Sequence, residues 1–462
     1  MPRVHNLFYS TDCEKRTLHR NICPSEKQQE MQQDRWNDLC EYLTDDLGEI
    51  SGCKIYSWLQ GSYRFGTQVR PAHKKDEFDI DLGIYFVWEG NSGGGKFSPD
   101  ELKSLVQSSL LRYKEEAGDD VLEVVSPPKE RCSRIRFSEN FHIDVPSYHL
   151  EEKKDFRILA TENYGWEYSD PKAFYVWFRS IFSDEENSQV RRIIRYLKIW
   201  AQLNMKQAPA SVLLTVLVAE AYALLTEEQV DGDDMALRNI AVCVAGRLEK
   251  DSDVRNPVNK SESLNRAPDE ETLEFIEKLR ILVGYADEAL ATSTEIEAAS
   301  IWSSVFHHFF PFPAPDPSDL NSRSLVPVKF VPEVSVVAIP EENIHLPYKG
   351  HNRIGPIPKK CEIKFILENS ANLPSGASVR WIVRNEADEA DFENDLGHLA
   401  GTGFRGREHS SYKGVHFMDV SISSALGEIL GFRRIPVEVG EQFVPLRNPR
   451  KPGWVRLNSR RR

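Results

Sequence analysis

FDIDLGIYFVW, residues 78–88, places two acids at alternate positions of an otherwise apolar run. Successive side chains of a β-strand point to opposite faces, so Asp79 and Asp81 share one face while Ile80 and Leu82 share the other. Two carboxylates on one face repel each other unless a positive charge lies between them. The run therefore predicts a strand with a buried apolar face and an acidic face that meets a cation.

Two further segments complete the predicted site. FHIDV, residues 141–145, carries Asp144 between apolar residues, where an acid needs a charged partner. QGS, residues 60–62, ends a short predicted strand in a glycine turn, where Gly61 permits close backbone approach to a phosphate and Ser62 offers N–H and hydroxyl donors. If Asp144 lies on an adjacent strand, the three acids can hold two metal ions roughly 3.5–4 Å apart, and Mg²⁺ is the expected ion.

Two later residues are candidate phosphate contacts. Lys198 follows Leu197 on an amphipathic helix and can reach a triphosphate as a point charge. Ser211 begins the next helix after Pro209, and phosphate oxygens bind at helix N-termini. Each has a purely structural alternative, because Lys198 can extend its amine to solvent and Ser211 can serve as a simple cap. The two alternate acids can likewise mark a solvated strand edge.

Composition limits the class of protein. The chain has 462 residues, a length that indicates two or three domains, and 28% of its residues are charged, as in ordinary folded proteins. Its net charge of −13 argues against wrapping long duplex nucleic acid. Seven scattered cysteines without a C-x-x-C pair favour a reducing cytoplasm over a disulfide framework or a structural zinc site. The most apolar run, 209–225, contains Glu220 and predicts a buried helix, so no membrane insertion is expected.

Hydrophobic periodicity changes along the chain. Helical stripes are predicted at 25–47, 98–110, 190–203, 211–225, 234–247, 269–285 and 296–310. Strands are predicted at 55–59, 78–88, 121–125, 134–137, 141–145, 363–367, 379–383, 415–420 and 435–439.

These patterns predict five segments. They are an α/β lobe at 1–187, a helical lobe at 188–310, a proline-rich linker at 311–334, a β-rich domain at 335–446 and a basic tail at 447–462. The expected fold class is α+β.

The order of the motifs resembles the bacterial cGAS/DncV-like nucleotidyltransferases, the CD-NTases, which belong to the polymerase-β-like superfamily. The resemblance is carried by QGSYRFGT at 60–67, DEFDIDLG at 76–83 and HIDVP at 142–146, and it extends over roughly residues 1–320. Residues from about 335 to 440 resemble, less specifically, the C-terminal sensor (AGS-C-like) domain of some of these enzymes.

The resemblance implies a polymerase-β-like lobe with a mixed sheet and helices, a helical lobe that completes the catalytic unit, and a small, mostly β domain. The implied catalytic, metal-binding residues are Asp79, Asp81 and Asp144. The implied nucleotide-binding residues are Gln60, Gly61, Ser62, Lys198 and Ser211.

The implied activity is Mg²⁺-dependent synthesis, with Mn²⁺ as a possible substitute, of a cyclic oligonucleotide second messenger from nucleoside triphosphates. Such an enzyme would act in cytoplasmic antiphage defence, with an effector protein that responds to the product and a phage-derived or nucleotide ligand at the C-terminal domain. The same carboxylates suit template-independent synthesis of linear RNA or DNA oligonucleotides, or nucleotide transfer to a protein or tRNA acceptor. An alternative of another class is an inactive nucleotide-sensing protein, against which the complete set of acids argues.

Overall fold

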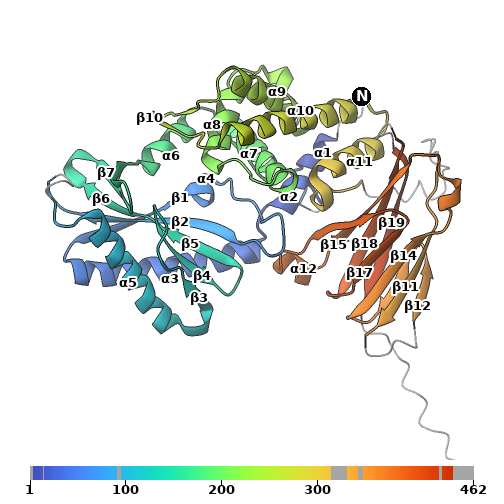
Figure 1. Cartoon of the computed structure of the whole chain (residues 1–462), viewed down its shortest axis with the longest axis horizontal. Helices are drawn as coiled ribbons and strands as arrows, with labels where there is room; N and C mark the ends of the chain where they lie inside the picture. Colours follow the sequence, from blue (N-terminus) through green and yellow to red (C-terminus); the bar gives the residue numbers. More distant parts are fainter. Residues whose placement is uncertain are drawn as a thin grey trace, which may run out of the picture. The chain divides into compact units, whose positions relative to one another are not determined.

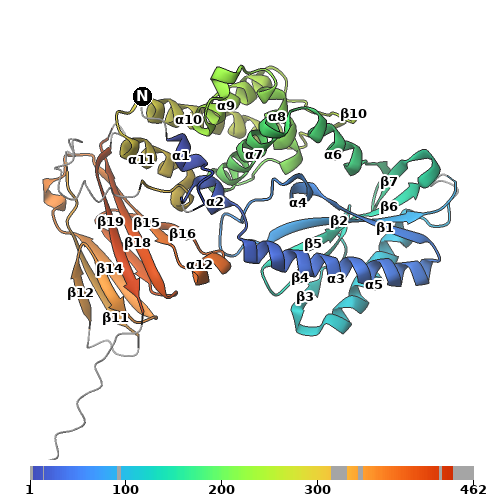
Figure 2. The same cartoon turned by 180° about the vertical axis from the view of Figure 1, so that it is seen from behind.

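The structure, a computed structural model, describes residues 4–13, 15–90, 95–313, 330–341, 347–425 and 429–440 (Figures 1 and 2). The chain divides into two compact units, Met1–Val326 with Phe392–Asp395, and Pro327–Asp391 with Leu396–Arg462. The expected basic tail at 447–462 and most of the expected linker at 311–334 lie outside the described residues.

A mixed sheet organises the first unit. Its strand order is β3-β4-β5-β2-β6-β7-β8, and β1 pairs with β2 beside this path. The bounds are β1 Lys54–Gln60, β2 Phe78–Val87, β3 Val121–Val124, β4 Ser133–Phe137, β5 Phe141–Val145, β6 Ser147–Glu151, β7 Phe156–Thr161 and β8 Gly165–Tyr168. Strand β2 is the centre, because it pairs in parallel with β5 over its first half and with β6 over its second half, and antiparallel with β1.

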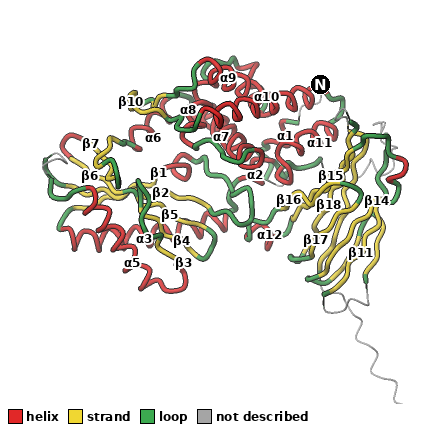
Figure 3. Tube along the Cα trace, in the orientation of Figure 1, coloured by secondary structure: helices red, strands yellow, loops and turns green. Residues whose placement is uncertain are grey.

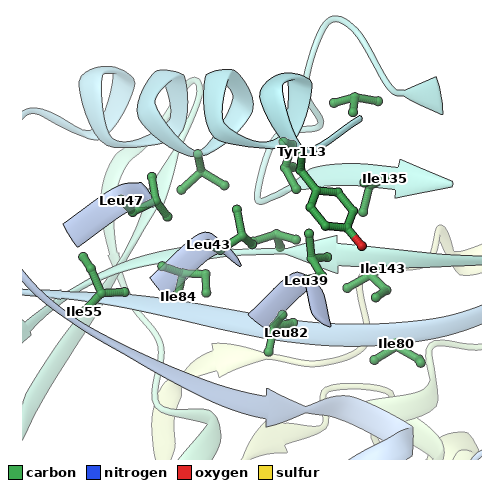
Figure 4. Packing of buried hydrophobic residues seen from close by; sticks show 14 of the residues in the cluster. Leu39, Leu43, Leu47, Ile55, Ile80, Leu82, Ile84, Tyr113, Ile135 and Ile143 are labelled. Atoms are coloured by element: carbon green, nitrogen blue, oxygen red, sulfur yellow. The ribbon is translucent and has the colours of Figure 1, made fainter. Parts of the chain in front are cut away.

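Two long helices, α3 (Glu26–Ser51) and α5 (Pro99–Ala117), cover one face of this sheet. Ser25 and Ser98 begin them with capping boxes, which satisfy backbone N–H groups of the first turn. Figure 4 shows the buried core between helices and sheet, formed by Leu39, Leu43, Leu47, Ile55, Ile80, Leu82, Ile84, Tyr113, Ile135 and Ile143.

This core sets the direction of the acidic strand. Ile80 of β2 and Ile143 of β5 are fully buried in it. Their neighbours along each strand therefore face the other side of the sheet, toward the helical part of the unit. Figures 1 and 2 show α7 (Asp184–Asn204) and α8 (Ser211–Tyr222) on that side.

The helical part follows the sheet in sequence and includes both N-terminal helices. Besides α7 and α8 it contains α1 His5–Phe8, α2 Leu18–Ile22, α6 Pro171–Ser180, α9 Asp233–Lys250, α10 Asp269–Ala291, α11 Glu295–Phe306 and the hairpin β9 Arg255–Asn256 with β10 Asn259–Ser263. The five-residue α4, Gly61–Phe65, lies instead between β1 and β2 in sequence and contacts both strands. The ring of Phe8 packs edge-on against Tyr196 of α7 and Trp302 of α11, so these contacts hold α1 against both helices. No helical stripe in the sequence predicted α1 or α2, because each spans barely one turn.

The second unit is a sandwich of two sheets, ordered β12-β11-β14-β17 and β13-β19-β18-β15-β16. Its strands, drawn in yellow in Figure 3, are β11 Val334–Pro340, β12 Tyr348–His351, β13 Ile354–Ile357, β14 Cys361–Leu367, β15 Ser378–Asn385, β16 Gly397–Thr402, β17 Arg405–His409, β18 Gly414–Ser423 and β19 Ile429–Val439, with the short helix α12 Asp388–Phe392 between β15 and β16 in sequence. Phe365 of one sheet contacts Trp381 of the other within a shared apolar core.

The predicted α+β class is confirmed, and each helix and strand predicted from periodicity corresponds to an observed element. Periodicity did not predict β6 to β8 or β11 to β13, most of which have six residues or fewer. Within the described ranges, every helix is too short or too polar to span a bilayer.

Truncation of the core under α3 is expected to destabilise the first unit. Leu43 is fully buried, so Leu43→Ala should lower the free energy of unfolding by about 2–5 kcal/mol through lost burial and a residual cavity. Leu111 on α5 is 46% exposed. Leu111→Ala, the matched control, should therefore change the free energy of unfolding by less than about 0.5 kcal/mol. Urea unfolding followed by circular dichroism measures both, and equal effects would contradict the described core.

Candidate active site

Four side chains meet on one face of β2 and β5. The strands pair in parallel, with Asp79 opposite His142 and Asp81 opposite Asp144. Because alternate residues of a strand share a face, all four point away from the α3–α5 core. One ligand atom each of Asp79, His142 and Asp144 lies within 4.8 Å of the other two. The structure thus brings the three predicted acids together and adds a histidine that the sequence did not assign.

Asp144 is held as a carboxylate by the neighbouring strand. Arg134 of β4 lies opposite Asp144 and donates from Nε and Nη2 to its two oxygens at 2.5 and 2.8 Å. Lys129 Nζ is 3.6 Å from Oδ2 of the same carboxylate. Burial raises the pKa of Asp144, but the hydrogen bonds and charge of Arg134 outweigh it, and the pKa lies below its ordinary value. Asp144 is therefore ionised at neutral pH.

The surroundings of Asp81 raise its pKa, whereas those of Asp144 lower the pKa of that carboxyl. Burial raises the pKa of Asp81 to about 8, the charges of Asp79 and Asp144 add to the rise, and Arg134 and Lys198 oppose it. Burial and the two neighbouring carboxylates thus disfavour the charged form of Asp81. Hard divalent cations prefer oxygen donors of this kind, and one bound here would favour the charged form. The donor set therefore fits a divalent metal.

The glycine turn packs directly onto this carboxylate. Gly61 begins α4 with φ +57°, and a Cβ on Gly61 would lie 1.9 Å from Oδ2 of Asp81. Any larger side chain would therefore strain the backbone and displace the acid. The contact follows from strand pairing, because Gln60 at the end of β1 lies opposite Asp81.

Gln60 supports the turn from inside the sheet. Its buried Nε2 donates to the hydroxyl of Tyr85 at 2.9 Å, and its Oε1 accepts from the hydroxyl of Tyr148 at 3.1 Å. Gly83 makes room for this amide, because a Cβ there would lie 1.9 Å from Nε2. These bonds engage both ends of the Gln60 amide within the protein, so its predicted contact with nucleotide remains a prediction.

Lys198 and Ser211 reach the same region from the helical part. Lys198 of α7 is 5% exposed, and its Nζ donates to the carbonyl of Thr67 at 3.1 Å. Burial and then Arg195 lower its pKa to about 7, against the opposing effect of Asp79 and Asp81. Ser211 is the exposed first residue of α8. A bound triphosphate would favour the charged lysine and meet the helix N-terminus.

A cavity of 440 Å³ joins these residues, a volume within the range of small-molecule sites. Predicted site residues in its wall are Gln60, Gly61, Ser62, Asp81, Lys198 and Ser211. Asp79 and Asp144 do not line it, but they lie beside Asp81 on the paired strands. Asp81 therefore belongs both to the acidic group and to the cavity.

Arg134 and the distal wall of the cavity were not predicted from the sequence. The ion pair of Arg134 with Asp144 could not be predicted, because it depends on which strand lies beside β5. The cavity's wall also includes Asn256 of the β9–β10 hairpin, Arg266 of the loop that follows it and Phe275 of α10, none of which had been assigned a role. One feature of the sequence could have identified His142. It precedes Asp144 by two residues, so both side chains lie on the same face of the strand.

Two parts of the chain match known domain families. Residues 56–148 match the family described as "Cyclic GMP-AMP synthase DncV-like, nucleotidyltransferase domain". Residues 322–440 match the "Adenylyl/Guanylyl and SMODS C-terminal sensor domain". The first match contains both acidic strands and the glycine turn.

Whole-chain similarity agrees with these matches. A cyclic GMP-AMP synthase of Escherichia albertii is 30% identical over 443 residues, covering 94% of this chain and 96% of the relative. A c-di-GMP synthase of Roseivirga ehrenbergii is 25% identical over 272 residues, covering 51% of this chain and 69% of the relative. The crystal structure of Escherichia coli DncV in its 3′-deoxy GTP bound form matches with a TM-score of 0.56 and 18% identity, over 66% of this chain and 97% of that chain. This structural likeness confirms the predicted fold.

Substitution of Gly61 should weaken ligand binding at the site while the rest of the first unit stays folded. Gly61→Ala forces Cβ against Asp81, so we expect nucleotide and cation binding to weaken by more than about tenfold. Gly246→Ala in α9, where a Cβ meets nothing within 4 Å, is the control. Calorimetric titration with a nucleoside triphosphate and Mg²⁺ measures both, and unchanged binding by Gly61→Ala would contradict the described contact.

Cation binding should release a proton at neutral pH. A pKa of about 8 keeps Asp81 mostly protonated at pH 7, and a metal ligand must be deprotonated. Affinity should therefore rise by up to about tenfold per pH unit from pH 6 and level off above pH 8. Calorimetry of Mg²⁺ binding in buffers of different ionisation enthalpy counts the proton. Asp81→Asn should abolish its release, and an absent proton in the unsubstituted protein would refute the shift.

Proposed function

Since this chain belongs to the DncV-like nucleotidyltransferases, we propose that it joins nucleoside triphosphates into a cyclic oligonucleotide second messenger. The observation that carries the proposal is the position of Asp81, which lines the nucleotide-sized cavity and lies beside Asp79 and Asp144. A cyclic dinucleotide is the expected product, because the synthase of Escherichia albertii is similar over nearly the whole of both chains.

The donor triphosphate would lie in the cavity. Gly61 and Ser62 form one wall and would contact its phosphates through their backbone N–H groups and the Ser62 hydroxyl. Lys198 would stabilise negative charge on the departing pyrophosphate, since its buried amine gains charge when an anion binds. Ser211 would bind phosphate oxygens through its hydroxyl and the N-terminus of α8.

The acids Asp79, Asp81 and Asp144 would hold divalent cations, for which we propose Mg²⁺ with Mn²⁺ as a substitute. When bound, such a cation lowers the pKa of the acceptor hydroxyl and neutralises charge on the leaving group. Arg134 keeps Asp144 deprotonated, which suits a cation ligand. A second transfer in the same cavity would close the ring.

We propose further that 1–187 and 188–310 form the catalytic unit, that 311–334 links it to the β-rich domain at 335–446, and that 447–462 is a basic tail. The match to a sensor family supports a ligand, of phage or nucleotide origin, for the second unit. The product would act on an effector protein in antiphage defence within the cytoplasm.

Product analysis tests this proposal. The protein is incubated with labelled nucleoside triphosphates and Mg²⁺, treated with phosphatase and examined by mass spectrometry. We expect a small phosphatase-resistant product. A ladder of phosphatase-sensitive oligomers would instead indicate linear synthesis, and no product under any condition would leave the sensing alternative.

Carboxylate substitutions test the site itself. Asp79→Asn and Asp81→Asn should each lower product formation by more than about 100-fold, because each removes a cation ligand. Asp76→Asn alters an exposed acid just before β2 and should leave the rate within about twofold of the unsubstituted protein. Full activity of both site variants would contradict the assignment.

A further inference from the structure

His142 carries a buried nitrogen that faces the acidic group. The residue is 7% exposed, and its Nε2 lies 2.8 Å from Oδ1 of Asp79. Among the described residues Nε2 nevertheless makes no hydrogen bond, so the two atoms approach without the required alignment. A buried ring nitrogen without a hydrogen bond lowers the stability of the folded protein unless another partner binds it.

The other ring nitrogen is oriented by a carboxylate. Nδ1 of His142 is 2.9 Å from Oε2 of Glu77. Arg136, opposite His142 on β4, donates from Nε to Oε1 of Glu77 at 2.7 Å and keeps this carboxylate in place. A carboxylate accepts hydrogen bonds, so the bond to Glu77 requires a proton on Nδ1 and leaves Nε2 facing Asp79.

This arrangement matches that of metal-binding histidines, which usually donate their second ring N–H to a carboxylate. One ring nitrogen of His142 lies within 4.8 Å of a carboxylate oxygen of Asp79 and of one of Asp144, and Nε2 is the nitrogen next to Asp79. The strand register explains the proximity, because His142 lies opposite Asp79 and two residues before Asp144.

We infer that His142 is a nitrogen ligand of the cation site formed with Asp79 and Asp144, and that it raises the preference of this site for transition-metal ions such as Mn²⁺. Imidazole binds such ions well, whereas Mg²⁺ favours oxygen donors and water. The inference rests on the proposed function for the use of the cation, but it concerns binding and can be measured without turnover.

The competing interpretation is a doubly protonated His142 that bridges Glu77 and Asp79 as an ion pair. That histidine would have no lone pair and would bind no metal. The two interpretations differ in whether a histidine nitrogen is bonded directly to the cation.

Pulsed electron paramagnetic resonance of bound Mn²⁺ decides between them. In the unsubstituted full-length protein we expect a directly bonded ¹⁴N coupling that changes to a ¹⁵N coupling when histidine is ¹⁵N-labelled. His142→Gln should lose this coupling, while His73→Gln, at an exposed histidine in the loop before β2, should retain it. Bound Mn²⁺ without histidine coupling in the unsubstituted protein would overturn the inference, even if His142→Gln fails to fold.

Affinities supply a second measurement. His142→Gln should weaken Mn²⁺ binding by about 10–100-fold and Mg²⁺ binding, read from displacement of Mn²⁺, by less than about threefold. Equal losses for both ions would contradict a nitrogen ligand. If the unsubstituted protein binds no Mn²⁺ and forms no product, the inference and the proposed function both fail. If it forms the cyclic product but its Mn²⁺ shows no nitrogen coupling, the inference alone fails.

Discussion

The in-register parallel pairing of β2 with β5 is the constraint on which the site depends. It places Asp79 opposite His142 and Asp81 opposite Asp144, while Ile80 and Ile143 enter the core beneath α3 and α5. A slip of β5 by one residue would bury Asp144 in that core and expose Ile143 to the acids. The hydrophobic core thus fixes the geometry of the polar face, although its residues touch no substrate.

Two arginines of β4 offset part of the negative charge of the clustered acids. Two unit charges 4 Å apart interact by about 4 kcal/mol at an effective dielectric constant of 20, so close carboxylates need compensation. Arg134 provides it for Asp144, and Arg136 anchors Glu77 beside His142. For Asp81, burial is the main cause of the raised pKa, and the charges of Asp79 and Asp144 add to it. A bound cation would favour the deprotonated form of this carboxyl.

The cavity is assembled from segments that are distant in sequence. The turn after β1 supplies Gly61 and Ser62, α7 supplies Lys198, and the start of α8 supplies Ser211. Each lies at the end of an element or on a buried stripe, so packing of the helical part against the sheet's polar face brings them together. Asp81 links this cavity to the acids because Gly61 has no side chain to keep them apart.

The sequence alone determined the α+β class, the position of most long elements and the three acids, because strand alternation and helical periodicity are local properties. It also identified Gly61, Ser62, Lys198 and Ser211 as candidates, through their residue types and their places in a glycine turn, on an amphipathic helix and at a helix start. The tertiary structure decided which charges face each other: Arg134 on Asp144, Glu77 on His142, and the Gln60 amide between two tyrosines. Those pairings depend on strand order and register, which arise from long-range packing and leave no trace in the spacing of residues along the chain.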